Sequence, residues 1–253
     1  MTNNEEFRSI ASEIAESVGR QVAERRRGGF DWSTKSSTSD VVTEIDTWAE
    51  EEIVRRITDQ RPNDGLIGEE GTSTAGTTGV VWVIDPIDGT TNFLYDIPGY
   101  GISIAVQVDA TTVAGAVFDP VRLELFSASI GQGATRNGER ISVSAAAELS
   151  TALIVTGFSY QAERRREQAV VLETVLPSVR DIRRLGGAAL DLCAVACGRV
   201  DASYERGLSR WDSAAGALIA QEAGAIVDDG DLTWASAPGI ADAFHSLLGE
   251  ANA

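Results

Sequence analysis

The spacing of apolar residues changes along the chain, and the predicted secondary structure changes with it. Two segments near the start have apolar side chains at intervals of three and four, the period that gathers them on one face of an α-helix. These segments run from 5 to 27 and from 40 to 58. A polar connector that starts with glycine, "GGFDWSTKSSTSD", lies between them and contains one lysine, Lys35. We therefore predict two amphipathic helices joined by a loop.

After Pro62 the apolar segments become short, rich in β-branched residues and separated by Gly, Asp and Asn. This pattern, from 65 to 144, is typical of a mostly antiparallel sheet. Helical and strand-like segments then alternate, which indicates a sheet covered by helices. The predicted helices are 162 to 176, 188 to 198 and 212 to 224, and the predicted strands are 181 to 186, 201 to 205 and 225 to 229. Because no repeat or linker separates the halves, we expect one α+β domain over 1–253, with sub-halves of about 1–145 and 146–253.

The charge balance argues against nucleic-acid and membrane partners. Thirty-eight acidic and 21 basic side chains leave a formal charge of −17, and such a field repels polyphosphate backbones and anionic lipid surfaces. No stretch approaches the roughly 18 uninterrupted apolar residues that a membrane span requires. The first residues lack the basic and apolar regions of a signal peptide. The sequence thus predicts a cytoplasmic protein.

The histidine and cysteine content narrows the chemistry further. His245 is the only histidine, and it lies in a helical pattern, where we predict a helix-face residue. Hydrolases that rely on a histidine base, and metal sites built on histidine, are therefore disfavoured. Cys193 and Cys197 are four residues apart in an apolar helical segment. This placement predicts two buried thiols rather than a disulfide or a zinc site.

Two carboxylates at the end of an apolar strand are the first candidate for chemistry. Asp85 and Asp88 follow "VVWVI", a run typical of a strand buried on both faces, and we expect Pro86 to end its hydrogen-bond ladder. Two carboxylates about 4 Å apart repel by about 1 kcal/mol in water and about 4 kcal/mol at an effective dielectric near 20. Between 57 and 121 the only basic residue is Arg61, among nine acidic ones. A hard cation that prefers oxygen ligands, Mg²⁺ first, fits better than a protein counter-charge.

The residues that follow can hold an anion beside that cation. Gly89 permits close backbone approach, and Thr90, Thr91 and Asn92 can cap the next turn. Free N–H groups at such a turn would bind an anion such as phosphate. Taken alone, the stretch also fits a capped loop in which Asp and Gly only form the turn.

Two further clusters repeat the arrangement of an acid beside a glycine at the end of an element. Glu69 and Glu70 end a short strand in "GLIGEE", and Glu205 precedes a turn after "DASY". Asp212 lies where we expect the N-cap of an apolar helix, a position that aspartate also occupies for structural reasons alone. The recurrence of the arrangement three times in one chain favours a shared role in binding a cation.

Three motifs carry a resemblance to a known family. "GEE", "DPIDGTTNF" and "WDSAAG", in this order and at these separations, resemble the signatures of the inositol monophosphatase family, which are Mg²⁺-dependent, lithium-inhibited sugar phosphatases. The resemblance runs from about residue 7 to about 250, because "KSSTSDVVTEID" and the segment from 181 to 207 also follow the family's pattern. It implies two or three Mg²⁺ ions, a homodimer, and five αβαβα layers with an antiparallel-rich N-terminal sheet and a mixed C-terminal sheet.

The resemblance also implies a set of metal ligands. They are Glu69, Asp85, the carbonyl of Ile87, Asp88 and Asp212, with Asp85 bridging two ions. The chemistry agrees, because hydrolysis of a phosphate monoester needs an activated water, neutralised phosphoryl oxygens and help for the leaving alkoxide. Mg²⁺ ions meet these needs without a histidine.

The remaining roles concern water, phosphate and substrate. By resemblance, Thr90, supported by Asp46, would orient the attacking water together with Glu69. The N–H groups of Gly89 and Thr90 would bind the phosphate. The substrate hydroxyls would meet a turn and one acid, namely Gly186, Gly187, Ala188 and Glu205.

Some positions depart from the family's pattern on the substrate side. Gly187 replaces a threonine, and Ser209 and Arg210 replace a His-Cys pair before Trp211. The substrate therefore stays open: inositol-1-phosphate leads, and fructose-1,6-bisphosphate and histidinol phosphate follow. Lys35 matches a family lysine near the phosphate and is equally explained as an exposed loop cation.

Two rival functions fit parts of the sequence. A haloacid-dehalogenase-type phosphatase needs aspartates two residues apart, whereas Asp85 and Asp88 are three apart with Pro86 between them. A regulatory binding protein with a residual phosphatase site is the alternative from another class, since some bacterial members of the family also bind transcription machinery. The presence of every metal-site residue favours the enzyme.

Overall fold

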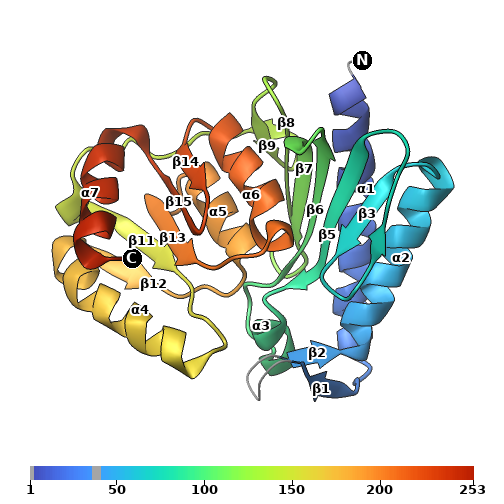
Figure 1. The fold of residues 1–253 in the computed structure, drawn as a ribbon, viewed down its shortest axis with the longest axis horizontal. Coiled ribbons are helices and arrows are strands. Elements are labelled where there is room, and N and C mark those ends of the chain that lie inside the picture. The colour runs from blue at the N-terminus through green and yellow to red at the C-terminus, as the bar shows by residue number, and fades with distance from the viewer. Residues whose placement is uncertain (1–2, 36–40) are drawn as a thin grey trace.

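The computed structural model describes residues 3–35 and 41–253. Within these residues, helices and two large sheets stack in layers (Figure 1). In order, the layers are helices α1 (Asn3–Arg26) and α2 (Glu44–Gln60), an eight-stranded sheet, helices α5 (Ala188–Ala196) and α6 (Arg210–Glu222), a five-stranded sheet, and helices α4 (Ala162–Val175) and α7 (Ala241–Ala251). The predicted α+β class with αβαβα layers is confirmed.

The eight-stranded sheet is built from the segment in which we predicted a mostly antiparallel sheet. Its spatial order is β10, β9, β8, β7, β6, β5, β3, β4, and among the described strands of this sheet only β3 and β5 pair in parallel. The strands are β3 (Gly65–Gly68), β4 (Ser73–Thr74), β5 (Val80–Asp88), β6 (Gly101–Val108), β7 (Thr111–Asp119), β8 (Glu124–Ser129), β9 (Ala134–Arg136) and β10 (Glu139–Arg140). The prediction for this sheet is confirmed.

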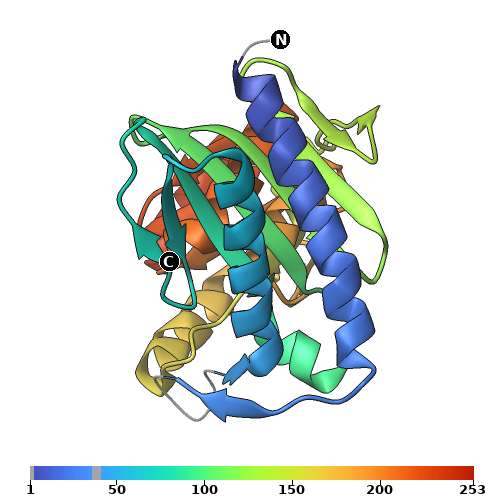
Figure 2. The same ribbon diagram turned by 90° about the vertical axis from the view of Figure 1, so that its right-hand side faces the viewer.

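Helices α1 and α2 lie side by side across one face of this sheet (Figure 2). The apolar stripe of α1, which includes Phe7, Ile14 and Val18, is fully buried against β6 and β7. The first turn of α1 is acidic and its last turn is basic, so charges of the favourable sign lie at both ends of the helix dipole. Burial of this stripe holds β6 in the middle of the sheet, next to β5, which carries the candidate aspartates Asp85 and Asp88.

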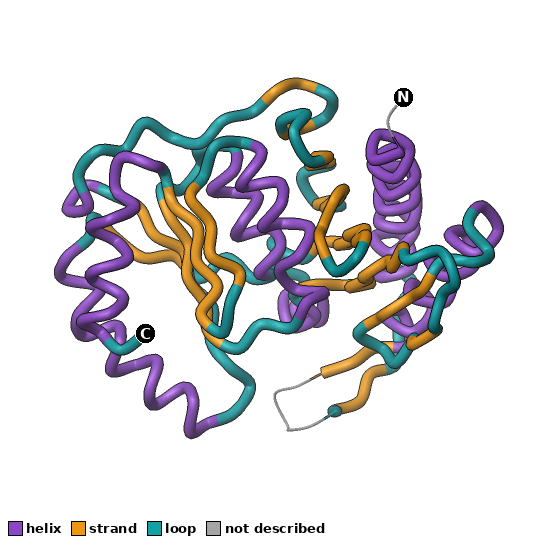
Figure 3. The backbone as a smooth tube through the Cα atoms, turned by 45° about the horizontal axis from the view of Figure 1, so that its top comes forward, coloured by secondary structure: helices purple, strands orange, loops and turns teal. Residues whose placement is uncertain are grey.

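The five-stranded sheet lies between α5 and α6 on one side and α4 and α7 on the other (Figure 3). Its order is β12, β11, β13, β15, β14, with parallel and antiparallel pairs. The three predicted strands are present as β12 (Asp181–Arg183), β13 (Ala202–Arg206) and β14 (Ile226–Asp229). The sequence analysis missed β11 (Leu153–Thr156) and β15 (Leu232–Ser236). By period alone, a short apolar run of this kind fits a strand or a segment of a buried helix.

The second predicted helix begins later than residue 40, which lies outside the described residues. Here β2 (Val41–Thr43) pairs with β1 (Trp32–Thr34), and α2 begins after Thr43. The Thr43 hydroxyl accepts the N–H groups of Ile45 and Asp46, and the Asp46 carboxylate accepts the Thr43 N–H at 2.8 Å. This reciprocal capping box explains the later start. It also fixes the side chain of Asp46, a candidate catalytic residue.

The remaining elements are short. Helix α3 (Thr90–Tyr95) follows β5, and 3₁₀ turns span Leu149–Thr151, Leu176–Ser178 and Pro238–Ile240. Within the described residues Cys193 and Cys197 are free thiols, the first buried and the second partly buried. His245 is exposed on α7, where its ring stacks on Trp234. None of the described helices is both long enough and apolar enough to cross a bilayer.

Candidate metal centre and active site

Strand β5 does not end at Pro86, as we expected, but continues to Asp88 with an irregular register. Asp85 pairs with Ser103 and Asp88 pairs with Gly101, so three steps along β5 match two steps along β6. Residues three apart in a regular strand point to opposite faces, and one extra residue brings the second back to the side of the first. The irregular register between Asp85 and Asp88 therefore lets both carboxylates reach the same place.

Asp212 reaches this place from the start of helix α6. It is the third residue of the helix rather than the predicted N-cap, because Ser209 occupies the cap. The Ser209 N–H donates to Asp212 Oδ2 at 2.6 Å, which orients the carboxylate. One carboxylate oxygen from each of Asp85, Asp88 and Asp212 lies within 4.8 Å of the others. Residues from both halves of the chain thus converge on one point.

Burial and mutual repulsion raise the pKa values of all three carboxyl groups. Asp85 is 1% exposed, and burial, followed by repulsion from Glu69, Asp88 and Asp212, holds its pKa well above the usual value. Burial raises the pKa of Asp88 to about 7, although two N–H groups of α5 donate to it at 2.8 and 3.1 Å. Burial and the neighbouring Asp88 raise the pKa of Asp212 to about 7. A divalent cation would replace the protons and relieve the repulsion, so this set of oxygen donors fits Mg²⁺.

Glu69 lies beside this triad and has a protein cation of its own. Its N–H donates to the Ile84 carbonyl of β5 at 3.2 Å. Lys35 Nζ lies 3.0 Å from Glu69 Oε1 and 2.6 Å from Glu70 Oε1. Burial lowers the pKa of Lys35, but the two glutamates raise it more, so the net value lies above the usual one. Lys35, which lies outside the window from 57 to 121, is therefore a protein counter-charge for the glutamate pair.

A buried acid that the sequence analysis did not single out holds the "GEE" turn. Glu50 of α2 is 3% exposed, and its carboxylate accepts the N–H groups of Glu70 and Thr72 at 2.8 and 2.9 Å. A Cβ at Gly68 would lie 2.4 Å from Glu50 Oε2, so glycine permits this approach. The sequence does contain a signal for the burial of Glu50. It lies three residues before Ile53, a spacing that places it on the buried face of the helix.

Thr90 and Asp46 form a buried pair next to the triad. Thr90 Oγ1 donates to the Ile87 carbonyl at 3.1 Å and lies 3.4 Å from Asp46 Oδ1. Burial raises the pKa of Asp46 to about 6, although two hydrogen bonds from Thr43 lower it. Gly89, with φ 88°, caps helix α3 in the left-handed region that favours glycine. The hydroxyl of Thr90 is therefore held in place by its neighbours.

A cavity of about 350 Å³ opens onto these residues from the substrate side. Its wall includes eight candidates named above, namely Lys35, Glu69, Asp88, Gly89, Gly186, Ala188, Glu205 and Asp212. Asp85, Thr90 and Asp46 are buried and are not part of this wall as far as the structure describes the chain. Arg184, which the sequence analysis did not assign, also lines the cavity. Burial raises the pKa of Glu205 to about 7, although Arg184 lowers it.

Comparison with known proteins identifies the family. The profile of the inositol monophosphatase family matches residues 3–249. The chain belongs to this family. Inositol-1-monophosphatase SuhB of Mycobacterium tuberculosis is 45% identical over 96% of this chain and 93% of the relative. A protein named Nus factor SuhB, from Pasteurella multocida, is 41% identical over 87% of this chain and 84% of its own length. The solved structure of M. tuberculosis SuhB matches with a TM-score of 0.87 and 42% identity, covering 100% of this chain and 99% of that one.

The departure from the family's pattern at Gly187 has a local explanation. A Cβ at Gly187 would lie 2.4 Å from Asp88 Oδ2. The following residues bind the same carboxylate, since the N–H groups of Ala188 and Ala189 donate to Asp88 at 3.1 and 2.8 Å. The turn therefore packs directly against a candidate metal ligand, and a side chain added at Gly187 in this structure would require Asp88 or the turn to shift.

Replacing Gly187 with alanine should disturb the metal centre more than the fold. Because the new Cβ would push on Asp88, we expect kcat to fall by about 10- to 100-fold and the Mg²⁺ concentration for half-maximal activity to rise. The matched control is Gly249→Ala on α7, where no described atom lies within 4 Å of the added Cβ and alanine favours the helix. Steady-state kinetics with a Mg²⁺ titration would measure both. If the two variants had the same kcat and the same Mg²⁺ dependence, the contact between Gly187 and Asp88 would not matter for the metal centre.

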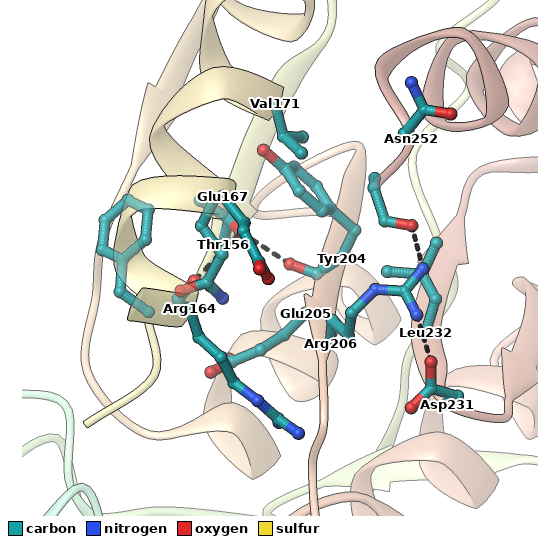
Figure 4. Close-up of a pocket in the computed structure, with 14 residues that line it drawn as sticks. Thr156, Arg164, Glu167, Val171, Tyr204, Glu205, Arg206, Asp231, Leu232 and Asn252 are labelled. Carbon is teal, nitrogen blue, oxygen red and sulfur yellow. Dashed lines mark hydrogen bonds and ion pairs between the residues drawn. The ribbon is translucent and has the colours of Figure 1, made fainter. Parts of the chain in front are cut away.

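A second cavity, of about 220 Å³, lies between helix α4 and strand β13 (Figure 4). It shares Phe158, Glu205 and Arg206 with the first cavity. The Arg206 guanidinium donates to the carboxylate of Asp231 and to the carbonyl of Ala253. Among the described residues, none of the candidate metal ligands lines it. We therefore assign the candidate chemistry of the family to the first cavity.

Proposed function

We propose that the protein is a Mg²⁺-dependent phosphatase that hydrolyses a polyol or sugar phosphate monoester, with inositol-1-phosphate as the leading substrate. The observation that carries this proposal is the convergence of Asp85, Asp88 and Asp212, whose oxygens lie within 4.8 Å of one another. Two halves of the chain contribute to the site, which supports a single catalytic domain over 1–253. Membership of a phosphatase family implies a phosphorylated substrate.

The residues present would hold two or three Mg²⁺ ions through Glu69, Asp85, the Ile87 carbonyl, Asp88 and Asp212. When bound, Mg²⁺ would neutralise charge on the phosphoryl oxygens and lower the pKa of the attacking water. Burial and repulsion raise the pKa values of Asp85, Asp88 and Asp212, so these three carboxyl groups would exchange protons for metal. The metal centre is thus part of the proposed function rather than an accessory to the fold.

The rest of the site would orient the reactants. Thr90 Oγ1, which has Asp46 Oδ1 as a neighbour at 3.4 Å, would position the attacking water together with Glu69. Gly89 and Thr90 begin helix α3, so their N–H groups would receive the phosphate. Glu205 and the turn from Gly186 through Gly187 to Ala188 would meet the alcohol. Their carboxylate and backbone groups suit hydroxyls, which supports a polyol over an apolar alcohol.

A substrate panel tests this function directly. We expect phosphate release from inositol-1-phosphate that requires Mg²⁺, is inhibited by lithium and stops in EDTA. Fructose-1,6-bisphosphate and histidinol phosphate test the alternatives on the same site, and adenosine 3′,5′-bisphosphate tests a nucleotide substrate. Full turnover after exhaustive chelation would remove the proposal.

A second function has support in the names of some relatives. Proteins named Nus factor SuhB match this chain at 40 to 42% identity, so a regulatory role remains the alternative from another class. For the same reason, the expectation of no nucleic-acid partner rests on the net charge of −17 alone. A variant without phosphatase activity separates the two: a regulatory protein would keep its cellular role. The resemblance also supports a homodimer, which sedimentation would test.

A further inference from the structure

A small cavity is lined by residues of helix α5, of strands β13 and β15, and of the end of β11. Its volume is about 10 Å³, which is enough for one water molecule. The polar side chains that line it include Asp191 of α5, Ser203 and Glu205 of β13, and Thr233 of β15. It shares Glu205 with both larger cavities, and none of its described lining residues is a candidate metal ligand.

Two buried polar atoms at this cavity lack partners. Asp191 and Ser203 are 4% and 5% exposed. Asp191 Oδ1 and Ser203 Oγ have no hydrogen-bond partner within the part of the chain that the structure describes. Buried polar groups in folded proteins are nearly always paired, and ordered water commonly supplies the partner. Two such atoms around one water-sized space indicate a shared partner.

Glu205 lies on the same side of the strand as Ser203. Alternate residues of a strand face the same way, so Ser203 and Glu205 share a face. Thr233 is paired with Glu205 across the sheet and lies on that face too. Burial and then repulsion from Glu205 raise the pKa of Asp191 well above the usual value. Asp191 and Glu205 are therefore close enough to interact electrostatically.

The carboxylate of Glu205 also packs against Gly157. A Cβ at this glycine would lie 1.9 Å from Glu205 Oε2. The carboxylate of Glu205 therefore lies directly against the backbone that follows strand β11. Contact with Gly157 and support from the small cavity together restrict where this carboxylate can point.

We propose that the cavity holds one ordered water that binds Asp191 Oδ1 and Ser203 Oγ and supports Glu205, so that Asp191 is a positioning residue for the recognition of substrate hydroxyls. The positioning role rests on the proposed function, because Glu205 is assigned to the substrate there. The water site itself does not depend on that assignment.

A high-resolution crystal structure tests the water site. We expect density for one water about 2.6 to 3.2 Å from Asp191 Oδ1 and Ser203 Oγ. Asp191→Asn should keep this water and Asp191→Leu should lose it. An empty site in the wild-type protein would overturn the proposal. An anomalous signal there after soaking in rubidium would also overturn it, since the occupant would be a monovalent cation.

Kinetics on two substrates test the positioning role. For Asp191→Leu we expect KM for inositol-1-phosphate to rise about 10-fold, with KM for p-nitrophenyl phosphate, which has no alcohol hydroxyls, within about 2-fold. Asp191→Asn should resemble the wild type on both. Gly157→Ala, which displaces Glu205 from its other side, should give the same selective rise even where the leucine variant does not fold.

The outcomes separate the two proposals. Equal changes on both substrates would overturn the positioning role. A wild-type protein that hydrolyses neither substrate would overturn the proposed function and the positioning role with it, whereas the density would still decide the water site.

Discussion

Replacing Asp85 with asparagine is expected to abolish Mg²⁺-dependent phosphate release while stabilising the metal-free protein. Asp85 is 1% exposed and is repelled by Glu69, Asp88 and Asp212. Loss of a proposed metal ligand should lower kcat by about 10³-fold or more, which corresponds to about 4 kcal/mol of transition-state stabilisation. Removal of one buried negative charge should raise the free energy of unfolding without metal by about 1 to 3 kcal/mol. Asparagine keeps an oxygen for the Ile87 N–H, which donates to Asp85 Oδ1 at 3.1 Å.

The opposite signs of the two effects make the experiment decisive. A variant that loses activity because it folds badly would also lose stability, whereas D85N should gain it in EDTA. Phosphate release and thermal unfolding measure the two quantities. Asp242→Asn, an exposed acid on α7, is the matched control and should change stability by no more than about 0.5 kcal/mol. Normal turnover by D85N, or a lower unfolding temperature in EDTA, would show that Asp85 is not part of a metal centre.

Local patterns predicted most of the fold because burial follows the period of each element. The stripe of α1 and the apolar segment of α5 are visible in the sequence, and both become buried helices. The missed strands β11 and β15 have four and five residues, so their order comes from neighbours in the sheet rather than from their own pattern. Helix α2 begins later than its apolar period predicted, because Thr43 caps the helix and so ends it on the N-terminal side.

The candidate site was predictable only where its chemistry is local. Asp85 and Asp88 are three residues apart at the end of an apolar strand with few basic residues nearby, and this local combination indicates a shared cation. The two side chains reach the same side of β5 only because the register shifts between them, and no sequence pattern predicted this shift. The approach of Asp212, and the contact of Lys35 with Glu69 across 34 positions, depend on the packing of separate layers. Resemblance to a family supplied the grouping that elementary periodicity does not contain.

Stabilisation by Mg²⁺ is expected to grow as the pH rises from 5 to 8. In the metal-free fold, burial and repulsion raise the pKa values of Asp88 and Asp212 from 3.8 to about 7. The folded state therefore holds protons that the unfolded chain releases between about pH 4 and 7. This contribution to the stability of the metal-free protein is present below about pH 4 and is lost as the pH rises to about 7. Mg²⁺ takes the place of these protons, so metal and proton compete at low pH.

Thermal unfolding in excess EDTA and in saturating Mg²⁺, measured over this pH range, tests the linkage. The quantity to compare is the gap between the unfolding temperatures with and without Mg²⁺ at each pH. We expect a gap below about 1 °C near pH 5 and of several °C near pH 8, since 1 kcal/mol shifts a protein of this size by roughly 2 to 4 °C. Acids with lowered pKa values away from the site, such as Glu52 and Asp64, affect both curves alike and cancel in the gap. D85N should show a smaller gap at every pH. A gap that stays constant with pH, or is largest near pH 5, would mean that the three aspartates do not exchange protons for metal.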